Sequence, residues 1–484
     1  MAQSKPHDEP QGGLPTVLES IVAKRRTHLP SIRERIAHVD TENLPRSTRS
    51  LYSALQGRNR FIMECKSSSP SLGLIREHYE PGAIARVYSR YASAISVLCE
   101  PDRFGGDYDH LQTVALSTHL PVLCKDFIID PIQVYAARYY GADAILLMMS
   151  IVDDETYAEL KALADSLDMD VLTEAITREE VDRACAFGVD IIGINNRNLH
   201  DLSIDLTRSA QLSEYVPAGK VVVSESGIRD NATVRRLGGH ANAFLVGSQL
   251  TSQPDIDRAA RRLVYGENKV CGLTSWSAAQ AARAAGAVYG GLVFAEGSPR
   301  NVSRETAADI ISHEPDLDYV AVSRRVDGFE ELAMPGVSAI QVHAPYQGSI
   351  AAELDLIARV RAAVGEREVW RAVSMDAPEG PEVARGLAGH VDRLVLDAGQ
   401  GGSGTSFNWS SIPAELKSTC LLAGGLDLNN LPEALQVGTA GVDLNSGVET
   451  SPGTKDSGLI ARAFAIIRST FSEEEQHSAL ASNL

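Results

Sequence analysis

Short apolar runs alternate with helix-length amphipathic stretches along nearly all of this 484-residue chain. The expected strands are 61–66, 94–100, 121–126, 143–149, 170–175, 190–196, 220–225 and 243–247, followed by 268–273, 289–295, 318–323, 338–343, 368–374, 392–397, 419–423 and 440–445. Eight β/α units are the number that closes a parallel barrel, and the chain carries that number twice. An open doubly wound sheet would usually have fewer strands and a glycine-rich phosphate loop after the first one, which neither half has. The expected fold class is therefore α/β, with two tandem (β/α)8 TIM barrels.

The length also argues for two domains, because a single core stops growing at about 250–300 residues. We expect a first barrel within residues 1–255, a short joint at 256–267 and a second barrel at 268–484 that ends in a polar tail. An N-terminal helical extension precedes the first strand, since residues 17–23 open an apolar-spaced segment. We expect the chain to act as a monomer.

Composition excludes several classes of function. The net charge of −18 argues against nucleic-acid binding, although a local pocket can still be positive and bind an anion. The 6 cysteines are dispersed without a Cys-x-x-Cys pair, and the 12 histidines show no metal-ligand spacing, so we expect free thiols in a reducing compartment and no metal. Residues 1–13 are polar and no apolar span of ~20 residues occurs, which predicts a cytoplasmic protein with no membrane interaction. Without a nucleotide-binding motif, we expect no cofactor.

Charged and polar side chains gather where the strands of the first half end. Glu64 and Lys66 close the first strand, two places apart and so on the same side. The other polar strand ends contribute Lys125, Glu174, Asn195, Arg197 and Glu225. A solvated strand end or a structural ion pair would explain any one of them. Together at one rim, they could hold a lysine near neutrality as a proton donor beside a carboxylate base.

The last two strands of each half end in small residues. These are Ser226, Gly227, Gly247 and Ser248 in the first half, and Gly424, Gly425, Asn445 and Ser446 in the second. Turns also need glycine, so such pairs are weak signals alone. Loops after strands seven and eight are the usual phosphate seat of this architecture, and the repeat in both halves favours phosphate-bearing ligands.

The second half has a sparser rim. Cys271 closes its first strand, His343 its fourth and Asp397 its sixth. A cysteine in a strand is more often inert filler, but opposite an aspartate it becomes a plausible acid–base pair. Arg300 could clamp a carboxylate by bidentate bonds, or it is a surface loop arginine. The glycine-rich segment 399–404 is flexible enough for a lid or an anion loop.

These motifs carry a family resemblance. The first half resembles indole-3-glycerol-phosphate synthase, and the second half resembles phosphoribosylanthranilate isomerase. The matching segments are 64–71, 123–127, 173–175, 193–197 and 224–228 in the first half, and 269–274, 294–300, 396–397, 422–426 and 441–449 in the second. The two resemblances together cover nearly all of the chain, from about residue 14 to residue 467. The chain as a whole resembles the bifunctional fusions of bacterial tryptophan biosynthesis.

The resemblance implies two consecutive reactions on phosphorylated anthranilate–sugar substrates. The second barrel would convert N-(5′-phosphoribosyl)anthranilate to 1-(2-carboxyphenylamino)-1-deoxyribulose 5-phosphate by an Amadori rearrangement. In it, Asp397 would be the general acid, Cys271 the base and Arg300 the holder of the anthranilate carboxylate. The first barrel would close this product to indole-3-glycerol phosphate with loss of carbon dioxide and water. There Lys125 would be the acid at the carbonyl and Glu174 the base for dehydration.

The remaining roles follow the same resemblance. Lys66 would position the substrate and share proton donation, Glu64 and Asn195 would belong to the same site, and Glu225 would orient it. The substrate-binding set is Ser69, Arg197, Ser226, Gly227, Gly247, Ser248, Arg300, His343, Gly424, Gly425, Asp443, Asn445 and Ser446. The sequence departs from the family patterns at Leu72, Ala344 and Asn445, where a lysine, a glycine and a serine are common.

Two alternatives remain open at this point. One barrel could be a scaffold that only stabilises the other, although a scaffold has no need for paired acids and bases. The second barrel could instead be a sugar-phosphate isomerase of histidine biosynthesis, for which an aspartate would be expected in place of Cys271.

Overall fold

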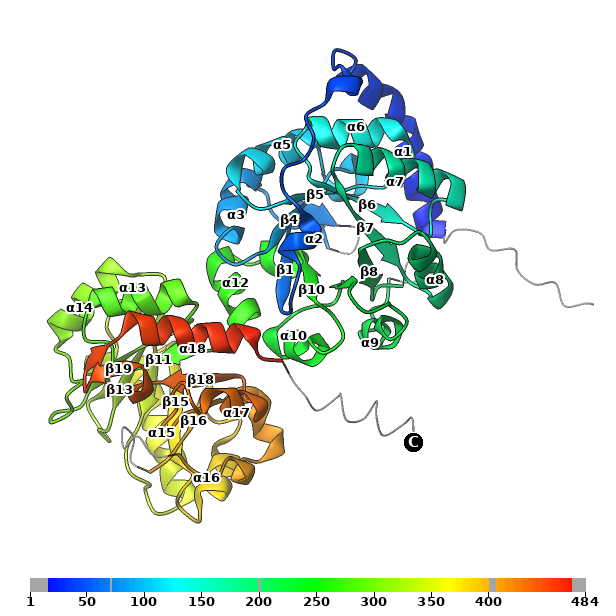
Figure 1. Ribbon diagram of the computed structural model, residues 1–484. Coiled ribbons are helices and arrows are strands. Elements are labelled where there is room, and N and C mark those ends of the chain that lie inside the picture. Colours follow the sequence, from blue (N-terminus) through cyan, green and yellow to red (C-terminus); the bar gives the residue numbers. More distant parts are fainter. Residues whose placement is uncertain (1–15, 70–71, 199–201, 400–405, 472–484) are drawn as a thin grey trace, which may run out of the picture. The chain divides into compact units, whose positions relative to one another are not determined.

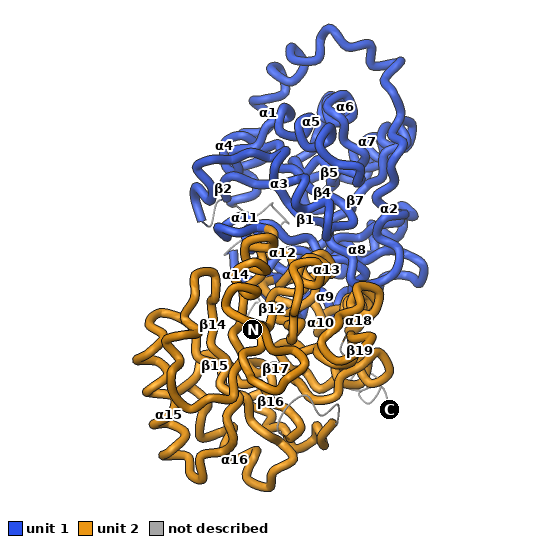
Figure 2. The backbone as a smooth tube through the Cα atoms, turned by 90° about the vertical axis from the view of Figure 1, so that its left-hand side faces the viewer, with its two compact units in different colours: residues 1–228, 240–256 blue, residues 229–239, 257–484 orange. Residues whose placement is uncertain are grey.

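The computed structural model describes residues 16–69, 72–198, 202–399 and 406–471. It divides into two compact units, residues 1–228 with 240–256 and residues 229–239 with 257–484 (Figure 2). The polar tail and residues 400–404 of the expected lid or anion loop lie outside the described residues.

The first unit contains a closed barrel of eight parallel strands (Figure 1). The strands are β1 (Arg60–Cys65), β4 (Ala94–Leu98), β5 (Val122–Lys125), β6 (Ala144–Met148), β7 (Asp170–Ala175), β8 (Ile191–Asn195), β9 (Val221–Glu225) and β10 (Ala243–Val246). Each strand pairs with its sequence neighbours, and β10 pairs with β1 to close the ring. Nearly every strand residue is buried, as expected for a sheet covered by helices on its outer face.

Helices connect these strands, and most begin at a polar cap. The helices of the first unit are α1 (Thr16–Arg35), α2 (Leu51–Ala54), α3 (Pro81–Tyr88), α4 (Pro101–Phe104), α5 (Tyr108–Ser117), α6 (Pro131–Tyr139), α7 (Asp154–Ser166), α8 (Arg178–Ala186), α9 (Thr207–Ser213) and α11 (Ser248–Thr251). Asp107, Asp130 and Asp153 accept backbone N–H bonds at the starts of α5, α6 and α7. Helix α1 is the expected extension before the first strand.

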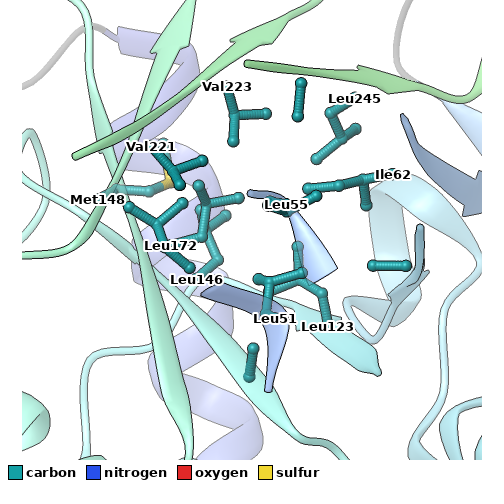
Figure 3. Packing of buried hydrophobic residues seen from close by; sticks show 14 of the residues in the cluster. Leu51, Leu55, Ile62, Leu123, Leu146, Met148, Leu172, Val221, Val223 and Leu245 are labelled. Carbon is teal, nitrogen blue, oxygen red and sulfur yellow. The ribbon is translucent and has the colours of Figure 1, made fainter. Parts of the chain in front are cut away.

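Side chains fill the interior of the first barrel (Figure 3). Four residues from separate strands are fully buried there, namely Ile62, Leu123, Leu172 and Val223. Leu51, in the short helix α2 directly before β1, packs into the same cluster. The barrel is therefore a packed core at this depth, as in other (β/α)8 barrels, and leaves the carboxyl ends of the strands for binding.

The second unit contains another closed barrel of eight parallel strands. Its strands are β11 (Lys269–Val270), β12 (Tyr289–Phe294), β13 (Asp318–Ser323), β14 (Val337–Val342), β15 (Glu368–Ser374), β16 (Arg393–Asp397), β17 (Cys420–Leu422) and β18 (Gly441–Leu444). Its helices are α10 (Asn231–Leu237), α12 (Ile256–Tyr265), α13 (Trp276–Ala285), α14 (Arg304–His313), α15 (Ile350–Val364), α16 (Gly380–Leu387), α17 (Leu431–Gln436) and α18 (Ser457–Ser469). The core includes a fully buried Trp370 whose ring meets that of Tyr289 edge-on, with centroids 4.8 Å apart. The predicted fold class, two tandem barrels, is confirmed.

Some elements differ from the sequence expectation. Strand β11 ends at Val270 rather than at residue 273, because Gly272 turns the chain with φ 71° and lies against Arg300. Two small hairpins were not expected, β2 (Ser68–Ser69) with β3 (Gly73–Leu74) and β19 (Glu449–Ser451) with β20 (Thr454–Lys455). Within the expected joint, helix α12 ends at Tyr265 and Gly266 then turns the chain with φ 94°. No helix in the described part of the chain combines the length and the apolar character that a membrane crossing requires.

Candidate active sites

A cavity of about 170 Å³ lies at the carboxyl ends of the first barrel's strands. Nine of the predicted residues line it, namely Glu64, Lys66, Ser69, Lys125, Glu174, Asn195, Arg197, Ser226 and Ser248. Glu225, Gly227 and Gly247 do not line it but are neighbours of residues that do. A Cβ on Gly247 would stand 2.5 Å from Lys66 Cε and 2.6 Å from Glu64 Oε1, so Gly247 borders the charged group directly.

The charges of this cavity form one connected cluster. Lys66 Nζ lies 2.5 Å from Glu64 Oε1, and Lys125 Nζ lies 3.5 Å from Glu64 Oε2 and 3.2 Å from Glu225 Oε2. Glu225 in turn lies over Gly193, where a Cβ would stand 2.2 Å from its Oε1. Ion pairs this deeply buried are maintained only when each charge has good partners, and here each lysine has a carboxylate.

These partners determine the pKa values of the cluster. Burial alone would raise the pKa of Glu64, but the ammonium groups of Lys66 and Lys125 lower it to about 2. Burial alone would lower the pKa of Lys125, but Glu64, Glu225 and Glu174 hold it above its ordinary value. The expectation of a lysine near neutrality was therefore wrong for Lys125, because three carboxylates surround it.

Glu174 is the group near neutrality instead. Burial and the neighbouring Glu225 raise the pKa of Glu174 to about 8. Asn195 donates a hydrogen bond to its Oε1 at 3.2 Å, and Asn195 Oδ1 accepts one from the Arg197 backbone N–H at 3.0 Å. The Arg197 guanidinium donates to the Leu202 carbonyl at 3.0 Å. A carboxyl group that exchanges its proton near pH 8, next to a cationic lysine, can perform acid–base chemistry.

The wall of this cavity also contains apolar residues that the sequence reasoning missed. Val17, Leu18 and Ile21 of α1 line it, as do Phe104 and Phe127. The two phenylalanine rings have centroids 6.0 Å apart. The signal available in the sequence was the apolar spacing of α1, which predicted a helix but not what the helix covers.

Basic side chains of α1 bind acidic residues of the barrel loops. Arg25 Nη2 lies 2.5 Å from Asp126 Oδ2, and the two side chains are 3 % and 0 % exposed. Asp126 also accepts a hydrogen bond from the Tyr108 hydroxyl at 3.0 Å. Arg35 reaches both carboxylate oxygens of Asp107, the cap of α5. Helix α1 is thus fixed beside the cavity by residue pairs from distant parts of the sequence.

One group of potential metal ligands occurs among the described residues. Ligand atoms of His28, Glu100 and Asp102 lie within 4.8 Å of one another. Glu100 already accepts three backbone N–H bonds at the start of α4, and His28 Nε2 lies 2.9 Å from Asp102 Oδ2. A second basic group, Lys24 Nζ, lies 3.9 Å from Asp102 Oδ2. This arrangement is a helix cap with an ion pair rather than a set of open ligands.

A larger cavity of about 400 Å³ lies at the carboxyl ends of the second barrel's strands. Every residue predicted for this barrel lines it, namely Cys271, Arg300, His343, Asp397, Gly424, Gly425, Asp443, Asn445 and Ser446. Ser323, Arg324 and Gln341 line it as well and were not predicted. Gln341 lies two residues before His343, so strand alternation places both side chains on the same side and could have indicated Gln341.

Asp397 and His343 are both mostly neutral in this cavity between about pH 4 and pH 7. Burial and the nearby Asp443 raise the pKa of Asp397 to about 7. Burial and the cation of Lys269 lower the pKa of His343 to about 4. His343 Nε2 lies 3.6 Å from Asp397 Oδ2, and the backbone N–H of Ala398 donates to Asp397 Oδ1 at 2.7 Å. Asp397 can therefore carry a proton at physiological pH and give it to a ligand.

The glycine turn after β17 lies against Asp397. Gly424 has φ 89° and Gly425 has φ 61°, a left-handed conformation that favours glycine. A Cβ on Gly424 would stand 3.0 Å from Asp397 Oδ1, so a side chain there would crowd the carboxyl group.

Burial raises the pKa of the Cys271 thiol, even though the positive charge of Lys269 acts to lower it.

Arg300 is paired with a protein carboxylate. Its Nε donates to Glu449 Oε1 at 2.9 Å and its Nη2 donates to Glu449 Oε2 at 2.8 Å. Lys455 binds the same carboxylate and also Asn445 Oδ1 at 3.0 Å. The bidentate clamp expected for a ligand is thus made to Glu449 on hairpin β19–β20, which orients the guanidinium at the cavity wall.

Two closed barrels of eight parallel strands, each with a buried acid–base cluster at the carboxyl ends of its strands, define a two-site enzyme of the (β/α)8 class. The family described as Indole-3-glycerol phosphate synthase matches residues 18–263, and the family described as N-(5′-phosphoribosyl)anthranilate (PRA) isomerase matches residues 268–465.

Relatives match almost the whole chain. The chain is 65% identical to the tryptophan biosynthesis protein TrpCF of Corynebacterium glutamicum, over 95% of this chain and 98% of the relative. It is 46% identical to the protein of the same name in Salmonella typhi, over 94% and 99%. The chain belongs to the indole-3-glycerol phosphate synthase family in its first barrel and to the PRA isomerase family in its second, and it is a bifunctional enzyme of tryptophan biosynthesis. Nothing in these findings favours a barrel that is only a scaffold.

Proposed function

We propose that the residues gathered in the two cavities divide the two activities between them. The second barrel opens N-(5′-phosphoribosyl)anthranilate and rearranges it to the aminodeoxyribulose phosphate. The first barrel closes that product to indole-3-glycerol phosphate. Residues 1–255 and 268–484 are the proposed functional domains, each with its complete set of site residues.

In the second barrel, Asp397 protonates the ring oxygen and Cys271 removes the C2′ proton. The pKa of Asp397, raised to about 7 by burial and Asp443, supports the first role because the group still carries a proton near neutral pH. Cys271 lines the same cavity, which supports the second role. Arg300 holds the anthranilate carboxylate with the guanidinium edge that Glu449 does not occupy. Gly424, Gly425 and Ser446 offer backbone N–H groups to the phosphate.

In the first barrel, Lys125 is the cationic acid at the substrate carbonyl, where oxyanion charge develops. Lys66 positions the substrate, and Glu64 keeps both ammonium groups oriented through contacts of 2.5 Å and 3.5 Å. Glu174 exchanges the proton for dehydration, in keeping with its pKa of about 8. The apolar wall from α1 packs against the aromatic ring of the substrate, and Ser226 and Ser248 bind its phosphate.

The observation that carries this proposal is the presence of two separate cavities, each lined by residues of one barrel. Substitution Asp397→Asn is expected to lower isomerase kcat at least ~100-fold and leave synthase activity intact, and Lys125→Met is expected to do the reverse. Loss of anthranilate-type fluorescence reports the first step, and indole absorbance reports the second. Loss of both activities in a folded single variant would contradict the division.

The chain is further proposed to act as a monomer. Among the described residues, the proposed acid and base of each site come from one barrel of the same chain, which supports this proposal. Light scattering at working concentration measures the mass directly, and a dimer mass would contradict this.

A further inference from the structure

Lys269 of β11 is a fully buried cation that the proposed roles leave unused. Its side chain is 0 % exposed, and its ammonium donates to Asp443 Oδ2 at 2.6 Å and to Gln341 Oε1 at 2.8 Å. Lys269 does not line the cavity, whereas both of its partners do. A buried charge is costly and is retained only where something compensates it, so its place beside the cavity needs a reason.

The position of Lys269 relative to Cys271 supplies one reason. The two residues are two places apart along an extended segment, so their side chains point to the same side. A Cβ on Gly291, in the neighbouring strand β12, would stand 2.7 Å from Cys271 Sγ and 3.0 Å from Lys269 Cε. The thiol and the lysine side chain therefore share one small space, and the positive charge of Lys269 favours the thiolate.

Asp443 links this pair to the opposite side of the cavity. It is the register partner of Lys269 on β18. Its Oδ2 binds the lysine, and its Oδ1 has no hydrogen-bond partner among the described residues. The negative charge of Asp443 acts on Asp397 and favours the protonated form of that carboxyl group.

We propose that Lys269 and Asp443 are positioning residues that assign the two proton-transfer duties of the second barrel. Lys269 favours the thiolate of Cys271, which makes that residue the base, and Asp443 favours the neutral form of Asp397, which makes that residue the acid. This inference rests on the proposed roles of Cys271 and Asp397. It goes beyond them because it names the neighbouring charges that favour the base form of one group and the acid form of the other.

The other charged groups around the two residues do not provide the same asymmetry. Lys455 and Arg300 also act on the Cys271 thiol, but Glu449 binds both of them. Around Asp397 the further charged or titratable neighbours are Lys269, which opposes Asp443 by favouring the ionised carboxylate, Asp376 and His343. Asp376 is exposed and so is well screened by water.

The rate at which iodoacetamide alkylates Cys271, followed across pH by peptide mass spectrometry on the full chain, tests this proposal without measuring turnover. Lys269→Met removes the cation, and we expect the alkylation midpoint to move up by about one pH unit or more. Asp443→Asn leaves the cation bound to Gln341, and we expect the midpoint to move down. Opposite shifts from the two variants distinguish an electrostatic role from simple loosening of the barrel, which would affect both variants alike. Cys420, buried in β17 of the same barrel, is the internal control for loosening.

An unchanged midpoint in Lys269→Met with Cys420 still protected overturns the proposal. If Lys269→Met exposes Cys420, Asp443→Asn decides alone, and a midpoint that stays or rises overturns the proposal. The role of the thiol itself is tested separately by isomerase activity in Cys271→Ser. Retained isomerase activity in Cys271→Ser would show that the thiol is not the base. The alkylation profiles of the chains that keep Cys271 would still report whether Lys269 controls the thiol.

Discussion

Glu174 and Asp397 are buried carboxyl groups that keep their protons to unusually high pH for one shared physical reason. Each lies out of water, and each has a second carboxylate close by, Glu225 in the first barrel and Asp443 in the second. Two neighbouring carboxylates resist simultaneous ionisation in a poorly solvated site. The lysines of the two clusters compensate the second carboxylate of each pair and leave the first one as the proton carrier.

The raised pKa of Glu174 predicts a pH-dependent cost to stability. Its folded-state pKa of about 8 lies above the ordinary value of 4.5, so the fold favours the protonated form. The stabilisation is complete below pH 4.5 and is lost as the pH rises through 8. Glu174→Gln, which cannot ionise, should abolish synthase turnover and raise the melting temperature of the first barrel more at pH 9 than at pH 5.5. A gain of ~1 kcal/mol corresponds to about 2–4 °C in a domain of this size.

The matched control for this prediction is Glu179→Gln on helix α8. That side chain is exposed, and its substitution should change the melting temperature little at either pH. Calorimetry at the two pH values measures both variants. Equal shifts for Glu174→Gln at pH 5.5 and pH 9 would show that ionisation of Glu174 carries no folding cost.

The site residues that could be predicted from the sequence are those at the ends of strongly patterned strands. Glu64, Lys125 and Asp397 each end an apolar run, and the barrel brings such ends to one rim. Lys269 was not assigned a role, because its partner Asp443 is 174 residues away in sequence and only the closed ring of strands makes them neighbours. The pKa direction of Lys125 was wrong because it depends on how many carboxylates approach the ammonium, which strand patterns do not reveal.

Helix α1 is the element whose contribution the sequence indicated least. Its apolar face lines the synthase cavity, and its basic residues bind acidic loop residues of the barrel. The strands, in contrast, were predicted to within a few residues at each end because buried parallel strands are nearly continuous apolar runs. The hairpins β2–β3 and β19–β20 were missed because they are short and mostly polar, without the alternation that identifies a strand.

We predict that Arg25→Met destabilises the first barrel and weakens synthase substrate binding. The substitution leaves the Asp126 carboxylate buried without its cation, which typically costs about 3–5 kcal/mol. Because α1 also supplies Val17, Leu18 and Ile21 to the cavity wall, the synthase KM should rise while isomerase activity stays unchanged. Thermal unfolding and separate assays of the two steps measure these effects.

Arg33→Ala on the same helix is the control for that experiment. Arg33 is 52 % exposed and pairs with Asp130 at 2.6 Å, so its loss should cost less than ~1 kcal/mol. The double variant Arg25→Met/Asp126→Asn should recover much of the lost stability, because no unpaired charge remains. Equal destabilisation by Arg25→Met and Arg33→Ala would contradict the importance of the buried pair.

The chain consists of two barrels with separate hydrophobic cores. The core of the first barrel includes Leu123 and Leu172, and that of the second includes Trp370 and Val395. The synthase cavity is lined by residues numbered 17 to 248 and the isomerase cavity by residues numbered 271 to 446. We therefore expect a substitution in one site to leave the activity of the other site unchanged.

This separation predicts that two inactive variants complement each other in a mixture. Asp397→Asn alone cannot form the intermediate, and Lys125→Met alone cannot close the indole ring, so neither converts N-(5′-phosphoribosyl)anthranilate to indole-3-glycerol phosphate. An equimolar mixture should do so, after a lag that shortens as both protein concentrations rise, because the intermediate must diffuse from one molecule to the other. Indole absorbance follows the product, with each variant alone as the blank. If the mixture forms no product although each variant retains its own half-reaction, a site must depend on the intact chemistry of the other barrel in the same chain.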